Sequence, residues 1–231
     1  MLILAFETSA KAGSVALLDE KKLLGESYQN TGLTHSQTLL VMAEDLLKSC
    51  GYTPQEVDAV AVAAGPGSFT GVRIGVAAAK GMAWGLQVPC HGVSTLEAMA
   101  KNFGSFDGIV CACMDARRNQ VYNALFRVEN GVFSRITEDR AIALKELAEE
   151  LATLEGKVYL VGDGSLVAKA ALGDRVIAPQ EHRMHQRAAG VAMVASEMIA
   201  AGVRADAESL QPNYLRLSQA EREKMEKERK L

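Results

Sequence analysis

The sequence is poor in the residues that mark several specialised classes of protein. Its 231 residues include only four cysteines, five prolines and one tryptophan. The cysteines form neither a CxxC pair nor a spacing typical of zinc sites, which argues against a disulfide scaffold and a zinc-binding module. We therefore expect reduced thiols packed in a core, as in a cytoplasmic protein.

A long hydrophobic run and a surplus of charge are also missing. No apolar run approaches the roughly 20 residues that a membrane-spanning helix needs, and Glu7 interrupts the first apolar run too early for a secretory signal. The net charge is −3, whereas a protein that binds nucleic acid on its own usually has a basic surplus. We therefore expect no membrane contact, and contact with RNA only through a partner.

The most distinctive stretch that is present runs from Gly65 to Gly85. It follows the apolar, strand-like run Ala59–Ala64, and Gly71, Gly75 and Ala79 recur in it at helical spacing. A glycine inside a helix costs roughly 1 kcal/mol relative to alanine. Repeated glycines on one face therefore predict that another backbone comes very close, either within the same domain or on a partner. An ordinary core helix with small residues fits the spacing equally well.

Two sets of elements follow each other along the chain. The first set has strands at 2–7, 14–18 and 23–28, a helix at 35–49, a strand at 59–64, a helix at 70–85, a strand at 90–93 and a helix ending near 101. The second has strands at 108–114, 120–128 and 132–136, a helix at 145–154, a strand at 157–161, a short helix ending at 172, a strand at 175–177 and a helix at 186–201.

This repeated order predicts an α/β protein with two lobes of βββαβα type. We place the first lobe at residues 1–103 and the second at 104–217, with helix 186–201 able to pack back on the first lobe. A tail at 218–231 alternates positive and negative residues, which is typical of a solvated terminal helix and also fits a helix that docks on a partner. The order of elements resembles the ribonuclease H-like fold of actin, sugar kinases and Hsp70, known as the ASKHA fold.

In that class the turn after the first strand of each lobe grips phosphate, and a carboxylate there helps to hold magnesium. Here Glu7 has no glycine after it, and the matching turn of the second lobe, Met114–Asn119, has an aspartate but no glycine. Two glycines survive in the turn expected on the adenosine side. We therefore expect no robust ATP hydrolysis by this chain alone. Candidate contacts to a nucleotide or phosphate are Glu7, Thr8, Ser9, Asp115, Arg117, Gly162 and Gly164.

Other catalytic and metal-binding patterns do not match. Gly71 is followed by Val72 and Arg73 instead of the Lys-Ser or Lys-Thr of a phosphate-binding loop. His35 begins a predicted helix, but the position one turn later, where a second metal-binding histidine would stand, is Leu39. There is no Gly-x-Ser-x-Gly elbow for a nucleophilic serine. We therefore predict no metal site and no catalytic residue.

Several segments together resemble one family, the bacterial TsaB (YeaZ) proteins. The block GPGSFTGVRIG at residues 65–75 is highly specific, and the other segments are modest alone but occur in the expected order. These other segments are LAFETS at 4–9, HSQ at 35–37, GVSTL at 92–96, DAR at 115–117 with VY at 121–122, and PNYLR at 212–216. The resemblance covers residues 1 to about 216.

The resemblance implies a two-lobed ASKHA fold without strong catalysis of its own. It implies a dimerization or scaffold subunit in the complex that adds a threonylcarbamoyl group to N6 of adenosine 37 in tRNAs that read ANN codons. A paralogue, TsaD, carries the metal and transfers the group, and a small ATPase, TsaE, binds the pair. The chain alone is expected to form a homodimer, to need no cofactor, and to meet tRNA, ATP or ADP, and Mg²⁺ only within the complex.

The docking surface is expected on the helices predicted at 35–49 and 70–85. Glycines there would let the helices of a partner approach closely, so a large residue at Gly75 is expected to abolish pairing and leave the chain folded. The predicted contact residues are His35, Leu39, Met42, Leu46, Phe69, Thr70, Val72, Arg73, Gly75, Val76 and Ala79.

Two other functions stay open at this point. An actin-like ATPase or kinase with a degenerate nucleotide site is favoured slightly by Glu7, Thr8 and Ser9. A glycoprotease-like peptidase has less support, because the sequence shows no triad around Ser68.

Overall fold

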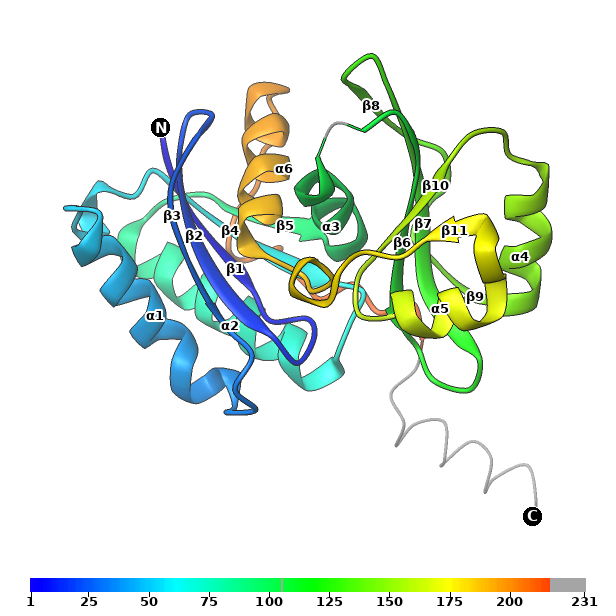
Figure 1. The fold of residues 1–231 in the computed structure, drawn as a ribbon. Coiled ribbons are helices and arrows are strands. Elements are labelled where there is room, and N and C mark those ends of the chain that lie inside the picture. Colours follow the sequence, from blue (N-terminus) through cyan, green and yellow to red (C-terminus); the bar gives the residue numbers. More distant parts are fainter. Residues whose placement is uncertain (105, 217–231) are drawn as a thin grey trace.

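The computed structural model describes residues 1–104 and 106–216, which form two lobes that are each built on one sheet (Figure 1). The first lobe contains β1 (Leu2–Glu7), β2 (Gly13–Asp19), β3 (Lys22–Gln29), α1 (His35–Ser49), the short helix Pro54–Glu56, β4 (Ala59–Gly65), α2 (Phe69–Leu86), β5 (Cys90–Ser94) and α3 (Thr95–Phe103). The second contains β6 (Gly108–Asp115), β7 (Gln120–Glu129), β8 (Val132–Arg135), β9 (Arg140–Ala143), α4 (Leu144–Thr153), β10 (Val158–Val161), α5 (Ser165–Leu172), the short helices Gly173–Arg175 and Glu181–Arg183, and β11 (Val176–Ile177). Helix α6 (Ala188–Ala200) follows.

The first sheet has the strand order β3-β2-β1-β4-β5. Strands β1 and β2 pair antiparallel, whereas β4 runs parallel to both β1 and β5. Side chains on a strand alternate between the two faces of a sheet. Leu4 and Phe6 therefore enter one hydrophobic cluster, and Ile3 and Ala5 enter another.

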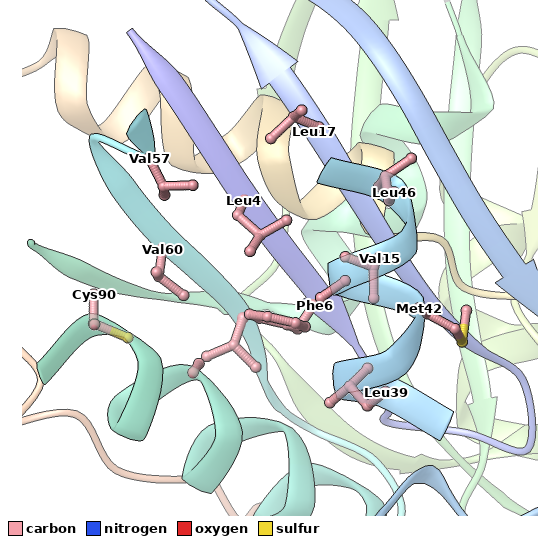
Figure 2. Packing of buried hydrophobic residues seen from close by; sticks show 14 of the residues in the cluster. Leu4, Phe6, Val15, Leu17, Leu39, Met42, Leu46, Val57, Val60 and Cys90 are labelled. Atoms are coloured by element: carbon pink, nitrogen blue, oxygen red, sulfur yellow. The ribbon is translucent and has the colours of Figure 1, made fainter. Parts of the chain in front are cut away.

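Different helices cover the two faces of this sheet. Helices α1 and α2 lie side by side on the face of Leu4 and Phe6, and α6 lies on the face of Ile3 and Ala5. Figure 2 shows the first of these clusters, with Leu39 of α1 directed toward the strands. Both faces of the sheet are therefore covered within the described part of the chain, and the outer sides of α1 and α2 lie at the surface.

The second sheet has the order β11-β10-β6-β7-β8, with β9 paired to β7. One face packs on α4 and α5, and the other packs on α3, which contributes Leu96 and Met99. Helices α3 and α6 contact each other and lie between the two sheets (Figure 1). The relative position of the lobes is therefore set by a helix pair at the centre of the molecule.

The predicted order of elements is confirmed, and most predicted bounds lie within two residues of the observed ones. Strand β9 was not predicted, because Arg140–Ala143 is short and its side chains are only half-buried. The charged tail predicted at 218–231 lies outside the described residues. Within the described part, no helix is both long and apolar enough to cross a membrane.

Candidate functional site

A buried carboxylic acid stands at the carboxyl end of β1. The side chain of Glu7 is fully buried, and its Oε1 accepts a hydrogen bond from the backbone N–H of Ser9. Glu7 Oε2 and the Ser9 hydroxyl have no hydrogen-bond partner among the described residues. The pKa of Glu7 is raised to about 7, mainly by burial and in part by the negative charge of Asp163, while the hydrogen bond from the Ser9 backbone N–H opposes the shift. This acid therefore changes its charge near neutral pH.

The second lobe brings another acid toward Glu7. Asp163 follows β10, and its Oδ1 accepts a hydrogen bond of 3.0 Å from Gln186 Nε2. Burial raises the pKa of Asp163, and the negative charge of Asp115 acts in the same direction. Two predicted nucleotide contacts, Glu7 and Asp115, therefore share one acidic region with Asp163, which stands between the predicted Gly162 and Gly164. Such a region favours a proton or a cation over a bare phosphate.

Gly162 and Gly164 flank Asp163 and have a structural role. A Cβ atom on Gly162 would lie 2.2 Å from Cys113 O, and one on Gly164 would lie 2.8 Å from the carbonyl carbon of Met114. The two glycines therefore let the turn after β10 lie directly against β6. The space in front of them is filled by the chain itself.

The turn between β6 and β7 contains no glycine, as the sequence showed, and adopts an uncommon conformation. Arg117, Arg118 and Asn119 all have positive φ, at 65°, 56° and 57°. The turn is held by Asp115, whose Oδ1 accepts a hydrogen bond of 2.7 Å from the backbone N–H of Arg117. The guanidinium of Arg117 is well exposed and lies 3.6 Å from the same carboxylate. Asp115 is thus occupied by its own turn.

Two glycines of α2, Gly71 and Gly75, face the turn after β1. A Cβ atom on Gly71 would lie 2.1 Å from the backbone oxygen of Thr8, and one on Gly75 would lie 2.2 Å from Thr8 Oγ1. The same hydroxyl donates a hydrogen bond of 2.8 Å to Gly71 O. The predicted close approach of a second backbone is therefore real, but it lies within the first lobe. A large residue at Gly75 would clash with Thr8, which argues against the expectation that it leaves the chain folded.

His35 is also engaged within the first lobe. Its Nε2 lies 2.8 Å from Ala10 O, and a Cβ atom on Gly13 would lie 2.8 Å from its Nδ1. The ring therefore fixes the start of α1 against the β1–β2 hairpin. No three His, Cys, Asp or Glu side chains in the described chain are grouped so that they could hold a metal ion.

Most of the predicted docking residues belong to the core of the chain. Figure 2 shows Leu39, Met42 and Leu46 on the side of α1 that faces the strands. The structure places them in the chain's own core, because an apolar stripe at helical spacing marks the buried side as readily as a docking side. That they contact a partner stays a prediction. The predicted contact residues that the structure buries are Leu39, Met42, Leu46, Val72, Gly75, Val76 and Ala79.

The opposite sides of the same helices form an apolar surface. We name Leu40 and Val41 of α1 and Ala77, Gly81 and Trp84 of α2 the outer helix face; all five are exposed. Trp84 is 79% exposed and Val41 is 57% exposed. A Cβ atom on Gly81 would meet nothing within 4 Å. In the sequence, this face is indicated by the single tryptophan, Trp84, and by the adjacent apolar residues Leu40 and Val41. The stronger apolar periodicity of the buried side obscured this signal.

The start of α2 carries the other predicted contacts, Phe69, Thr70 and Arg73. Thr70 and Arg73 are exposed, and Phe69 is half-buried. The ring of Phe69 stacks on Tyr214 with centroids 4.2 Å apart. The guanidinium carbon of Arg73 lies 4.1 Å from the centroid of the Phe69 ring. The motif at 212–216 is distinctive in the sequence, but nothing in it connects Tyr214 with the start of α2, because the two segments are far apart in the chain.

Two cavities lie beside the segment that follows α6. One of about 370 Å³ is lined by residues including Ser94, Asp206 and Asn213, and one of about 530 Å³ is lined by residues including His91 and Asp206. Neither is lined by Glu7 or Asp163 in the described part of the chain. The predicted nucleotide contacts therefore do not surround either of these cavities.

The two sheets and the helices that cover them define a two-lobed α/β protein with the ASKHA fold. A solved protein with low sequence similarity shows the same fold: component A of (R)-2-hydroxyglutaryl-CoA dehydratase from Acidaminococcus fermentans, at 13% identity, superposes with a TM-score of 0.52 over 87% of this chain and 99% of that one.

Closer relatives identify the family. The family model described as TsaD, tRNA N6-adenosine threonylcarbamoyltransferase, matches residues 29–224. The tRNA threonylcarbamoyladenosine biosynthesis protein TsaB of Bacillus subtilis is 35% identical over 96% of both chains, and that of Escherichia coli is 34% identical over 94% of this chain and 95% of its own. The structure of YeaZ from Pseudomonas aeruginosa, 30% identical, superposes with a TM-score of 0.81 over 93% of this chain and 99% of that one. The chain belongs to the TsaB (YeaZ) family.

Proposed function

We propose that this chain is a non-catalytic subunit in the biosynthesis of threonylcarbamoyladenosine in tRNA, and that it binds and activates a TsaD-type catalytic subunit. The names of its relatives in Bacillus subtilis and Escherichia coli support the pathway. In this proposal a TsaE-type ATPase and tRNA join the assembled pair, nucleotide and Mg²⁺ act at the level of the complex, and the chain forms a homodimer when alone.

The observation that carries the docking role is the outer helix face. An exposed tryptophan beside exposed aliphatic side chains and an unfilled glycine offers a partner both a large apolar anchor and room for close contact. Tryptophan is among the residues that most often dominate the free energy of binding at protein interfaces. The buried sides of α1 and α2 support this face by fixing both helices on the sheet.

The lack of strong catalysis is supported by the turns between the lobes. Glu7 is half-protonated near neutral pH and its Oε1 is bonded to Ser9. Asp115 is occupied by the backbone of Arg117. Neither carboxylate is presented by a glycine turn of the kind that contacts phosphate groups through free backbone N–H groups.

The test is pairing with the TsaD-type subunit of the same organism, measured by size-exclusion chromatography with light scattering. We expect a heteromeric peak that replaces the homodimer. Trp84→Ala should weaken pairing by at least ~30-fold, because it removes the largest exposed anchor, without changing the melting temperature of the isolated chain. Leu166→Ala, at a position on α5 of the second lobe that is 62% exposed, is the matched control and should pair normally.

Two outcomes would contradict the proposal. Normal pairing of the Trp84→Ala variant would place the docking surface elsewhere. Magnesium-dependent turnover of ATP by the pure chain, retained after repurification and lost in Glu7→Ala, would favour the ATPase. In the reconstituted transfer reaction, the chain should be required but inactive alone.

A further inference from the structure

The segment after α6 returns to the first lobe and is fixed along it. Lys80 of α2 donates hydrogen bonds from Nζ to Glu208 O at 3.1 Å and to Leu210 O at 2.9 Å. The backbone N–H of Asn213 donates to Ala64 O at 2.6 Å. Residues 208–216 therefore follow a defined path from the edge of the first sheet to the start of α2, and we name them the return segment.

Two strands leave space for the return segment. A Cβ atom on Gly65 of β4 would lie 2.3 Å from Asn213 O, and one on Gly92 of β5 would lie 2.5 Å from Leu210 Cδ1. A side chain at Gly65 would therefore clash with the backbone of the segment, whereas one at Gly92 would meet the end of the Leu210 side chain. Its path is thus built into the sheet as well as into the segment itself.

The return segment ends in a three-residue cluster with the start of α2. The Tyr214 ring stacks on Phe69 with an interplanar angle of 20°. Arg73 Nε donates a hydrogen bond of 2.8 Å to the Tyr214 hydroxyl, and its guanidinium lies over Phe69 and 5.6 Å from the centroid of the Tyr214 ring. Arg73 is thus held by two rings and one hydrogen bond, although its side chain is exposed.

The cluster leaves the two terminal nitrogens of Arg73 available. Only Nε is used, and neither Nη has a hydrogen-bond partner among the described residues. No carboxylate of the described residues lies within salt-bridge distance of Arg73. A planar guanidinium with both Nη groups available matches a carboxylate in a bidentate pair. Because the rings already restrict its rotamers, such a pair would lose little side-chain entropy on forming.

Arg73 continues the outer helix face along α2. It stands four residues before Ala77, which in turn stands four before Gly81, so the three share one side of the helix. A partner helix that lies on the outer helix face would therefore reach Arg73 at the start of α2.

We propose that Tyr214 is a positioning residue for partner binding: it holds Arg73 so that both Nη groups meet a carboxylate on the TsaD-type subunit. The inference rests on the proposed function and adds the return segment to the docking surface. A purely structural alternative is that the cluster only ties the return segment to α2. In that case its loss would change the stability of the isolated chain and leave the affinity for the partner unchanged.

The test is a double-mutant cycle on the affinity for the TsaD-type subunit, measured by isothermal titration calorimetry with full-length chains. Arg73→Ala should weaken binding by about 30-fold, and Tyr214→Phe, which keeps the ring and removes the hydroxyl, by about 5-fold. In the Arg73→Ala background, Tyr214→Phe should have no further effect, because the hydroxyl acts through Arg73. Arg73→Lys, which keeps the charge but loses the planar fork, should recover only part of the affinity.

Tyr159→Phe is the matched control. Tyr159 of β10 packs against Phe103 of α3, away from the outer helix face, and the Tyr159→Phe variant should bind the partner like the unsubstituted chain. The dependence of the affinity on salt should be weaker in Arg73→Ala than in the unsubstituted chain.

The outcomes separate this inference from the proposed function. If Trp84→Ala abolishes pairing but Arg73→Ala does not weaken it, the docking role stands and the carboxylate contact is wrong. An equal loss from Tyr214→Phe in both backgrounds would show that Tyr214 does not act through Arg73. If Arg73→Ala weakens only the homodimer, the carboxylate lies on a second copy of this chain and the inference is overturned. No pairing by the unsubstituted chain would contradict the proposed function itself.

Discussion

The two sides of α2 use small residues for opposite purposes. On the inner side, Gly71 and Gly75 make room for Thr8, whose backbone oxygen and hydroxyl lie where their Cβ atoms would be. On the outer side, Gly81 has nothing within 4 Å of its Cβ position, and Trp84 stands beside it in the open. One helix therefore carries an internal close contact and an unfilled surface, and the same residue type marks both.

The largest effect is expected from alanine at the inner glycine that faces backbone. Gly71→Ala should lower the free energy of unfolding by roughly 3–4 kcal/mol, because the oxygen of Thr8 cannot move away without breaking the turn after β1. Gly81→Ala is the control on the outer side, and should raise stability by up to about 1 kcal/mol through helix propensity. Urea denaturation of both variants measures the difference.

Equal stabilities of these two variants would contradict the difference between the inner and outer sides of α2, because Gly71 and Gly81 would then both behave as ordinary helix glycines. A stable Gly71→Ala chain that fails to pair would instead return Gly71 to the docking surface.

The second effect concerns the buried acid beside the inner side of α2. Because the pKa of Glu7 rises from 4.5 in the unfolded chain to about 7 in the folded one, the folded chain binds more protons between those values. Its stability should therefore fall as the pH rises from about 4.5 to 7, by about 3 kcal/mol in total.

Glu7→Gln removes this titration and keeps the size of the side chain. The difference in unfolding free energy between the variant and the unsubstituted chain, measured by urea denaturation from pH 5 to pH 8, should grow with pH in favour of the variant. A constant difference across this range would show that Glu7 keeps one charge state throughout.

The sequence was informative where a pattern is local. The continuous apolar run at the start of Leu2–Glu7 and the helical stripe of α1 predicted both elements with their observed bounds, because each pattern coincides with the observed burial. The glycine spacing of α2 also predicted a close backbone correctly. It could not show that this backbone belongs to Thr8, more than 60 residues earlier, because a spacing contains no information about the element that fills it.

The proposed docking surface was less predictable for the same reason. An apolar stripe such as Leu39, Met42 and Leu46 marks a side of a helix that is buried, and does not distinguish the chain's own sheet from a partner. The outer residues Leu40 and Trp84 became visible only once the sheet was in place. The contact between Arg73 and Tyr214 joins residues 141 positions apart, and no periodicity of either segment predicts it.

The smallest expected effect distinguishes the two glycines on the inner side of α2, Gly71 and Gly75, from each other. Gly75 faces the hydroxyl of Thr8, at 2.2 Å from its Cβ position, whereas the Cβ atom of Thr8 lies at an ordinary 3.5 Å. Thr8→Ala should cost about 1 kcal/mol alone through loss of the bond to Gly71 O. The same substitution should remove most of the destabilisation caused by Gly75→Ala, because it removes the atom that clashes.

Thr8→Ala should give no such rescue to Gly71→Ala, because the atom that opposes Gly71 is the backbone oxygen of Thr8, which every residue keeps. Two double-mutant cycles on the unfolding free energy measure the contrast: strong coupling between positions 8 and 75, and none between 8 and 71. Coupling of equal size in both cycles would mean that the turn after β1 relaxes as a unit. The inner side of α2 would then tolerate small additions anywhere, and its difference from the outer side would be one of burial alone.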